Sequence, residues 1–270
     1  MTGNSASAAP ERKVGLIGFG AIGRSVAQIL LSEPGYRLGI MTRTSDIGGN
    51  AGDRAEQIDS IAGLVDWQPD IVVEAASAQA FAHYVPACLT AGIDVVAASV
   101  GALQDADLMA RILPICDEKD SHLIVPAGAV GGLDHIAAAA LHAETHVTYT
   151  SRKPPAAWTS EIASLGLSEA VTQGAVTLYE GDAREAARRY PKNLNAGLTI
   201  ALSAGFERTR VRVVADPEVD QNTHEISIHG PLGESFMRFR NTPDPANPKT
   251  SAITAFSLAA ATMRRFGALQ

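Results

Sequence analysis

Cysteine is scarce in this chain, which has only Cys88 and Cys116 among its 270 residues. Each lies in a segment of helical composition, among alanines, leucines and isoleucines. We interpret both as buried thiols in a reducing cytoplasm, with a disulfide or a catalytic thiol as the alternatives. No spacing of cysteine and histidine matches a zinc site, so we expect no bound metal.

Long apolar runs and an excess of positive charge are also lacking. No run approaches the roughly 20 apolar residues that cross a bilayer, and residues 1–12 read as a flexible tail rather than a signal peptide. We therefore expect no membrane partner. A net charge of −7 argues against a nucleic-acid partner, because phosphate binding needs a positive face. An anionic substrate would need a local basic cluster.

What is present is a regular alternation of apolar strands and amphipathic helices over residues 13–130. The strands are apolar along their whole length, which is typical of strands covered by helices on both faces. This pattern predicts an α/β fold with a doubly wound parallel sheet, a Rossmann domain. The predicted strands are Val14–Gly18, Tyr36–Met41, Ile71–Ala75, Val95–Ser99 and Leu123–Pro126.

Beyond Gly131 the pattern changes to that of a second α+β domain, residues 131–246, with a mixed or antiparallel sheet. We predict helices over 133–143, 182–189 and 195–204, and strands over 146–150, 210–215, 224–229 and 234–240. Residues 230–233 form a plausible hairpin turn between the last two strands. After a linker at 241–248, the segment 249–265 has helical composition, and we assign residues 247–270 to the first domain.

The segment Gly18-Phe19-Gly20-Ala21-Ile22-Gly23 is a G-x-G-x-x-G element that follows a strand and opens a helix. In the dinucleotide fingerprint Gly18 allows a tight turn, Gly20 admits the pyrophosphate, and Gly23 allows close packing of helix and strand. The amides at the helix start, including those of Ala21 and Ile22, then face the phosphates. We predict dinucleotide binding; the alternative is an ordinary strand–helix turn.

The second predicted strand ends without the carboxylate that usually binds the ribose 2′-hydroxyl. Arg43 stands there between threonines, so we predict that NADP is accepted beside NAD, unless Arg43 is a solvated loop residue.

Ligands in this architecture bind beyond the carboxyl ends of the strands. Small residues there are further cofactor contacts or else ordinary turns: Ala75, Ser77, Ser99, Gly101 and Ala129.

Several motifs together resemble the L-aspartate dehydrogenases, and the resemblance covers nearly the whole chain beyond the tail. The glycine loop is common to many families, but the later motifs are more specific. They are Val14–Gly23, Val72–Ser77, Val100–Leu103, Pro126–Asp134, Arg152–Pro155, Pro191–Asn195, Asn222–Ile226 and Asn247–Ser251.

This resemblance implies reversible, NAD- or NADP-dependent deamination of L-aspartate to iminoaspartate, then oxaloacetate and ammonia; alternatively the imine feeds NAD biosynthesis. It implies that His224 is catalytic, that Ala129 and Asn195 contact the cofactor, and that the chain is a homodimer. It also implies that residues 131–246 bind substrate and dimerise, with the C-terminal helix packed on the cofactor domain.

The chemistry agrees with these assignments. Hydride loss from Cα needs an uncharged amine, and imine hydrolysis needs an activated water, so a base such as histidine is suitable. Two carboxylates call for cations or amides, for which we propose Lys153, Lys192 and Asn193; the alternative is surface solubility. The rival interpretations are a homoserine-dehydrogenase-like or dihydrodipicolinate-reductase-like enzyme, and a non-catalytic dinucleotide sensor.

Overall fold

The chain divides into two units in a computed structural model that describes residues 11–43, 47, 53–190 and 194–267. The first unit comprises residues 1–97, 111–124 and 259–270, and the second comprises residues 98–110 and 125–258. The boundaries differ from those expected at residues 98–110, 125–130 and 247–258. The first of these segments carries the 3₁₀ helix η2 (Val100–Gln104), which packs against helices α8 (Ala183–Arg189) and α9 (Asn195–Ala204) of the second unit.

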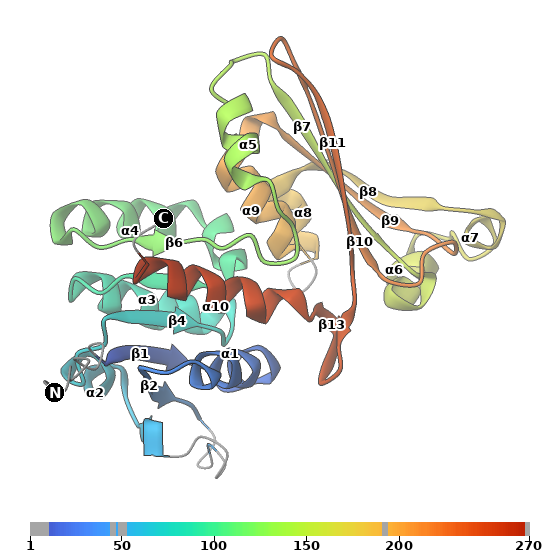
Figure 1. Cartoon of the computed structure of the whole chain (residues 1–270). Helices are drawn as coiled ribbons and strands as arrows, with labels where there is room; N and C mark the ends of the chain where they lie inside the picture. The colour runs from blue at the N-terminus through green and yellow to red at the C-terminus, as the bar shows by residue number, and fades with distance from the viewer. Residues whose placement is uncertain (1–10, 44–46, 48–52, 191–193, 268–270) are drawn as a thin grey trace, which may run out of the picture. The chain divides into compact units, whose positions relative to one another are not determined.

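A six-stranded parallel sheet forms the centre of the first unit, in the order β3-β2-β1-β4-β5-β6 (Figure 1). This arrangement confirms the predicted doubly wound α/β fold, and every residue of β4 and β5 is buried. The strands are β1 (Arg12–Ile17), β2 (Tyr36–Met41), β3 (Ala55–Ile58), β4 (Ile71–Glu74), β5 (Val95–Ala97) and β6 (Leu123–Ile124).

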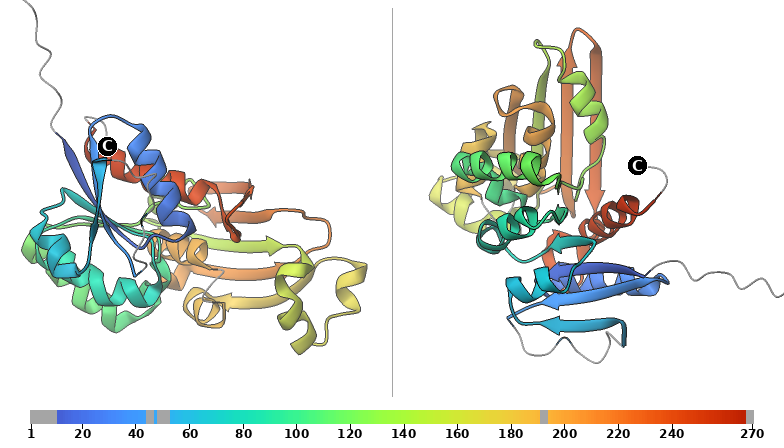
Figure 2. Two further views of the ribbon diagram at one scale, coloured as in Figure 1. Left: turned by 90° about the horizontal axis from the view of Figure 1, so that it is seen from below. Right: turned by 90° about the vertical axis from the view of Figure 1, so that its left-hand side faces the viewer.

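Helices cover both faces of this sheet, with α1 (Ala21–Ser32) on one face and α3 (Ala78–Thr90) on the other (Figure 2). Helix α1 buries Val26, Ala27 and Leu30, the stripe expected of an amphipathic helix. The remaining helices that contribute to this unit are α2 (Ile61–Asp66), α4 (Ala106–Lys119) and the end of α10 (Ile253–Arg265). Among the described residues, no helix is long and apolar enough to cross a membrane.

The two cysteines lie in helices, as predicted, but only one of them is fully buried. Cys88 in α3 has no exposed surface, and burial raises the pKa of its thiol to about 12. Cys116 in α4 is half-buried. Both thiols are free.

A five-stranded mixed sheet forms the second unit, in the order β11-β10-β7-β9-β8. Strands β7 and β9 are parallel and the other neighbours are antiparallel, which confirms the second domain's predicted mixed sheet. Gly230 pairs with Gly233 at the predicted hairpin turn. The strands are β7 (His146–Lys153), β8 (Val176–Asp182), β9 (Thr209–Ala215), β10 (Asn222–Gly230) and β11 (Gly233–Asn241).

Helices α5 (Leu133–Ala139), α8 (Ala183–Arg189) and α9 (Asn195–Ala204) lie along one face of this sheet (Figure 1). Between them and the sheet is a core that includes Tyr149, Trp158 and Ile226. The shorter elements are η3 (Pro155–Trp158), α6 (Thr159–Ser164), α7 (Ala170–Gln173) and η4 (Phe206–Arg208).

Several elements differ from the sequence prediction. The prediction omitted β3 and β8, which are edge strands with polar residues and, in β8, a register shift at Thr177/Tyr179. The predicted linker 241–248 instead contributes to the small hairpin β12 (Pro243–Asp244) and β13 (Asn247–Ser251), so α10 begins only at Ile253. Residues 1–10 of the predicted tail lie outside the described residues, and β1 already begins at Arg12.

Candidate active site

The glycine loop between β1 and α1 has the geometry of a dinucleotide-binding turn. Gly18 has a φ of +97°, and a Cβ there would lie 2.7 Å from the Cβ of Ala76. A Cβ on Gly23 would lie 2.1 Å from the carbonyl oxygen of Gly18, so the helix approaches the strand as closely as glycine permits. Around Gly20, by contrast, nothing lies within 4 Å of the added Cβ. The loop therefore leaves no room for a side chain at Gly18 or Gly23, but it has open space beside Gly20, where a phosphate could approach.

The start of α1 is suited to an anion. In the described structure no side chain caps Gly20, the N-cap residue, and the first turn contains no acidic residue. The amides of the first turn, including those of Ala21 and Ile22, have no partner within the helix, and the helix dipole places partial positive charge beside them. These features fit the pyrophosphate of a dinucleotide.

The segment after β4 lies directly against the glycine loop. The amide of Ala75 donates to the carbonyl of Ile17 over 2.8 Å, and the buried carboxylate of Glu74 accepts from the amides of Ala76 (2.8 Å) and Ser77 (3.2 Å). The structure thus brings Ala75 and Ser77 to the predicted cofactor loop. The Ser77 hydroxyl also caps α3, where it accepts from the amide of Ala80.

Arg43 is exposed, two residues beyond the end of β2. Its strand adjoins the glycine loop, because the amide of Gly18 donates to the carbonyl of Met41 over 2.9 Å. The position fits a contact to the ribose of a dinucleotide on that loop. Residues 44–46, which follow Arg43, lie outside the described residues.

In the second unit, His224 on β10 faces the core between two strands. It lies opposite Ser151 of β7 and is 5% exposed. Its Nδ1 atom is 2.8 Å from the phenol oxygen of Tyr149, and the two rings are nearly parallel, with centroids 6.0 Å apart. Its Nε2 atom is buried and has no hydrogen-bond partner among the described residues.

Burial and a neighbouring cation favour the neutral form of this imidazole. Burial, and secondarily the positive charge of Lys153, lower the pKa of His224 to about 4. Lys153, at the end of β7, is only 5% exposed, and its Nζ atom lies 5.4 Å from the centre of the Trp158 ring. A neutral imidazole beside a buried cation can accept a proton from a bound molecule while the cation binds a carboxylate.

Four predicted cofactor residues lie in this unit. The side-chain amide of Asn195 donates to the carbonyl of Ala98 over 3.4 Å, next to Ser99, and buried Gly101 follows in η2. Asn241 donates to the carbonyl of Ala129 over 2.7 Å.

Asn241 pairs with Asn222, two residues before His224, so Ala129 lies beside the start of β10. The remaining predicted substrate residues, Lys192 and Asn193, lie outside the described residues. The described part of the chain contains no cluster of three or more metal-ligating side chains.

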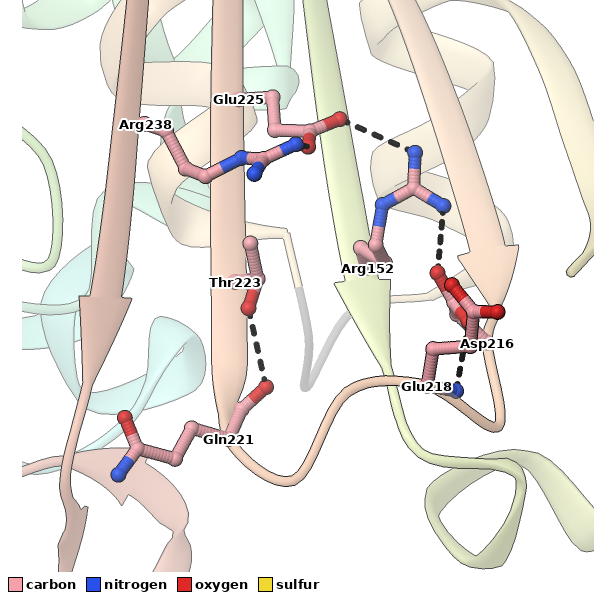
Figure 3. A network of polar contacts seen from close by, with 7 residues as sticks. All are labelled: Arg152, Asp216, Glu218, Gln221, Thr223, Glu225 and Arg238. Carbon is pink, nitrogen blue, oxygen red and sulfur yellow. Dashed lines mark hydrogen bonds and ion pairs between the residues drawn. The ribbon is translucent and has the colours of Figure 1, made fainter.

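The opposite face of the same strands carries a network of ion pairs that sequence reasoning missed (Figure 3). Arg152 bridges Asp216 over 2.8 Å and Glu225 over 3.1 Å, and Arg238 contacts Glu225 through two nitrogens at 2.7 and 3.0 Å. The network joins β7, β10 and β11 and the end of β9. It therefore stabilises the strand register directly behind Lys153 and His224.

Tyr149 is a further residue that the sequence interpretation missed. The alternation of β7 could have indicated it, because residues 149, 151 and 153 share one face of the strand. Nothing in the local sequence, however, shows that β10 lies beside β7 with Ser151 opposite His224.

Comparison with known proteins gives matches across both units. A family model described as "Aspartate dehydrogenase, C-terminal" matches residues 134–265, and one described as "Homoserine dehydrogenase, NAD binding domain" matches residues 18–126. The "L-aspartate dehydrogenase 2" of Bordetella pertussis is 43% identical over 257 residues, 94% of this chain and 96% of the relative. The L-aspartate dehydrogenase of Methanosarcina barkeri is 42% identical over 191 residues, 70% of each chain.

Among solved structures, the chain is similar to the crystal structure of aspartate dehydrogenase from Thermotoga maritima. The TM-score is 0.73 at 24% identity, and the match covers 95% of each chain. This similarity supports the fold.

Proposed function

Because the chain belongs to the L-aspartate dehydrogenase family, we propose that it is an enzyme that oxidises L-aspartate with NAD or NADP. The reaction yields iminoaspartate, which takes up water to give oxaloacetate and ammonia, and it is reversible. The observation that carries the proposal is the neutral, buried imidazole of His224 beside the cation of Lys153.

His224 acts as the base in this proposal. It removes a proton from the α-ammonium group, so that the nitrogen lone pair can form the C=N bond as a hydride leaves Cα. Once this proton has been released to solvent, the same imidazole removes a proton from the water that attacks the imine carbon. A bound nicotinamide supplies the hydride acceptor. The low pKa of His224 means that the imidazole is unprotonated throughout the neutral range.

Lys153 binds a substrate carboxylate in this proposal, because it is a cation held out of water close to the imidazole. We propose Lys192 and Asn193 as further contacts to the two carboxylates of aspartate. A substrate carboxylate bound at Lys153 would offset the positive charge of this lysine, and the pKa of His224 would rise toward its ordinary value.

The proposed cofactor contacts divide into two groups. The pyrophosphate binds at the open loop around Gly20, held by the start of α1, and Arg43 binds a 2′-phosphate where NADP is used. We also propose contacts from the remaining small and polar residues: Gly18, Ala21, Ile22, Gly23, Ala75, Ser77, Ser99, Gly101, Ala129 and Asn195. Arg43→Glu should move the kcat/KM preference toward NAD, and an unchanged preference would contradict the assignment.

A spectrophotometric assay tests the function. Purified protein should reduce NAD or NADP with L-aspartate and not with glutamate, alanine or homoserine. His224→Gln should lower kcat by about 10²-fold while cofactor affinity is retained. His229→Gln is the matched control, because His229 lies on the same strand but has a side chain that is 60% exposed. Turnover of homoserine instead, or cofactor binding without any turnover, would contradict the proposal.

We also propose that the chain is a cytoplasmic homodimer. A second copy could cover the sheet face opposite the helices, where Phe236 is 61% exposed. The free state of both thiols is in keeping with a reducing compartment. Sedimentation equilibrium and cell fractionation test the two statements, and a monomer at micromolar concentration would contradict the first.

A further inference from the structure

We propose that Tyr149 is a positioning residue: it accepts a hydrogen bond from Nδ1–H of His224 and so holds the neutral imidazole in the tautomer whose Nε2 atom carries the lone pair. The role of that lone pair as a base rests on the proposed function. The tautomer itself is a property of the resting protein and can be measured without substrate.

The strand register places His224 between a phenol and a cation. Ser151 lies directly opposite His224, and Tyr149 and Lys153 are two residues to either side of it on the same face of β7. The Tyr149 phenol contacts Nδ1 at 2.8 Å. The imidazole therefore has a hydrogen-bonding neighbour on one side and a positive charge on the other.

That charge distinguishes the two nitrogens. A neutral imidazole carries one proton and one lone pair, and the hydrogen bond made by one nitrogen decides the state of the other. A lysine ammonium only donates, so it favours a lone pair on the nitrogen that is not occupied by Tyr149. This nitrogen is Nε2, which has no hydrogen-bond partner among the described residues.

If the phenol accepts from Nδ1–H, its own proton needs another acceptor. Tyr149 is completely buried, and a buried phenol needs a hydrogen-bond partner. The hydroxyl of Ser151, also completely buried, lies beside the phenol but makes no well-formed hydrogen bond among the described residues. In this proposal the chain runs from Nδ1–H to the phenol oxygen, and from the phenol O–H to the Ser151 oxygen.

The arrangement matters because the other tautomer cannot act as a base at Nε2. If Tyr149 donated to Nδ1 instead, the imidazole proton would lie on Nε2, and only a donor would face a bound amine or water. The fraction of protein in the productive tautomer would then limit kcat directly.

Two-bond ¹⁵N–¹H correlation spectra of the full-length protein at neutral pH report the tautomer directly. The wild type should show His224 protonated at Nδ1. Ser151→Ala removes the acceptor for the phenol proton, so Tyr149 should turn to donate to Nδ1 and move the imidazole proton to Nε2. Tyr149→Phe should give a mixture of the two forms. A wild-type protein protonated at Nε2, or a tautomer unchanged in both variants, would overturn the proposal.

Kinetics provide a second measurement. Tyr149→Phe and Ser151→Ala should each lower kcat by about 10-fold, with less change in the KM for L-aspartate. Tyr179→Phe is the matched control, because Tyr179 belongs to the same core and donates to the carbonyl of Asp182 over 3.0 Å. It should leave the tautomer unchanged.

Phenylalanine retains the ring, which packs closely against Gly197 of α9, so Tyr149→Phe should fold. If it does not, Ser151→Ala still decides the question. A protein with the expected tautomer but no aspartate oxidation would refute the proposed function and leave this inference intact.

Discussion

Acidification should destabilise the second unit, because His224 is buried in its neutral form. Its pKa is lowered from 6.5 to about 4 in the folded chain, so between these values the unfolded chain binds one more proton than the folded chain. Stability is therefore lost as the pH falls from 6.5 to about 4 and changes no further below that. From about pH 7 to about pH 5 the linkage relation gives a loss of about 2 kcal/mol.

Urea denaturation followed by tryptophan fluorescence can measure this loss. The chain has two tryptophans, Trp67 in the first unit and Trp158 in the core around His224, so a Trp67→Phe background reports on the second unit alone. In that background His224→Gln removes the titrating group. The loss of unfolding free energy between the two pH values should then be smaller by about 2 kcal/mol than with histidine present. Equal losses in both proteins would refute the reasoning that His224 is buried and neutral.

Three further outcomes follow from the first unit. Gly23→Ala should lower the melting temperature and abolish dinucleotide binding, because the new Cβ would lie 2.1 Å from the carbonyl oxygen of Gly18; circular dichroism and calorimetric titration test this. Gly20→Ala should keep the melting temperature but weaken NADP binding by about 10-fold, since its Cβ meets no protein atom but narrows the approach to the phosphates. Arg265→Gln should reduce stability by about 1 kcal/mol in urea titrations read at Trp67, because Arg265 contacts the buried Asp94 at 2.5 Å from a half-exposed position.

The contribution of the Arg265–Asp94 contact to stability depends on pH. Burial alone would raise the pKa of Asp94, but hydrogen bonds from Arg265 and His122 outweigh it, and the pKa lies below its ordinary value. The contribution of this carboxylate is therefore present above the ordinary value of 3.8 and disappears as the pH falls through the lowered one. Asp94→Asn should remove this acid-labile part of the stability, and an unchanged acid transition would contradict the assignment.

Sequence reasoning predicted the elements whose burial or backbone conformation follows from their own residues. The apolar run Ile71–Glu74 is entirely buried, and the glycine sextet has its steric reason in the close approach of Gly23 to Gly18. The edge strands were not predicted, because each pairs along one side only and therefore tolerates polar residues, which interrupt the apolar pattern of a strand. Ala55–Ile58 and the bulged β8 are of this kind.

The surroundings of His224 could not be predicted in the same way. Its identification rested on the family resemblance, since any of seven histidines could serve as a base. The contact with Tyr149 joins residues 75 positions apart, and it depends on the register of two strands rather than on local composition. The ion pairs of Arg152 have the same origin. Long-range pairings of this type need the folded chain.

Strand β10 carries two neighbouring residues whose side chains need opposite faces of the sheet. His224 faces the core, and Glu225, the next residue, binds two arginines on the other face. Inserting or deleting a single residue upstream in this strand would exchange them, burying an unpaired carboxylate among aromatic rings and presenting the imidazole to guanidinium groups. Related sequences can therefore differ in this strand by substitutions but not by insertions or deletions. Differences in length should be confined to the turns at its two ends.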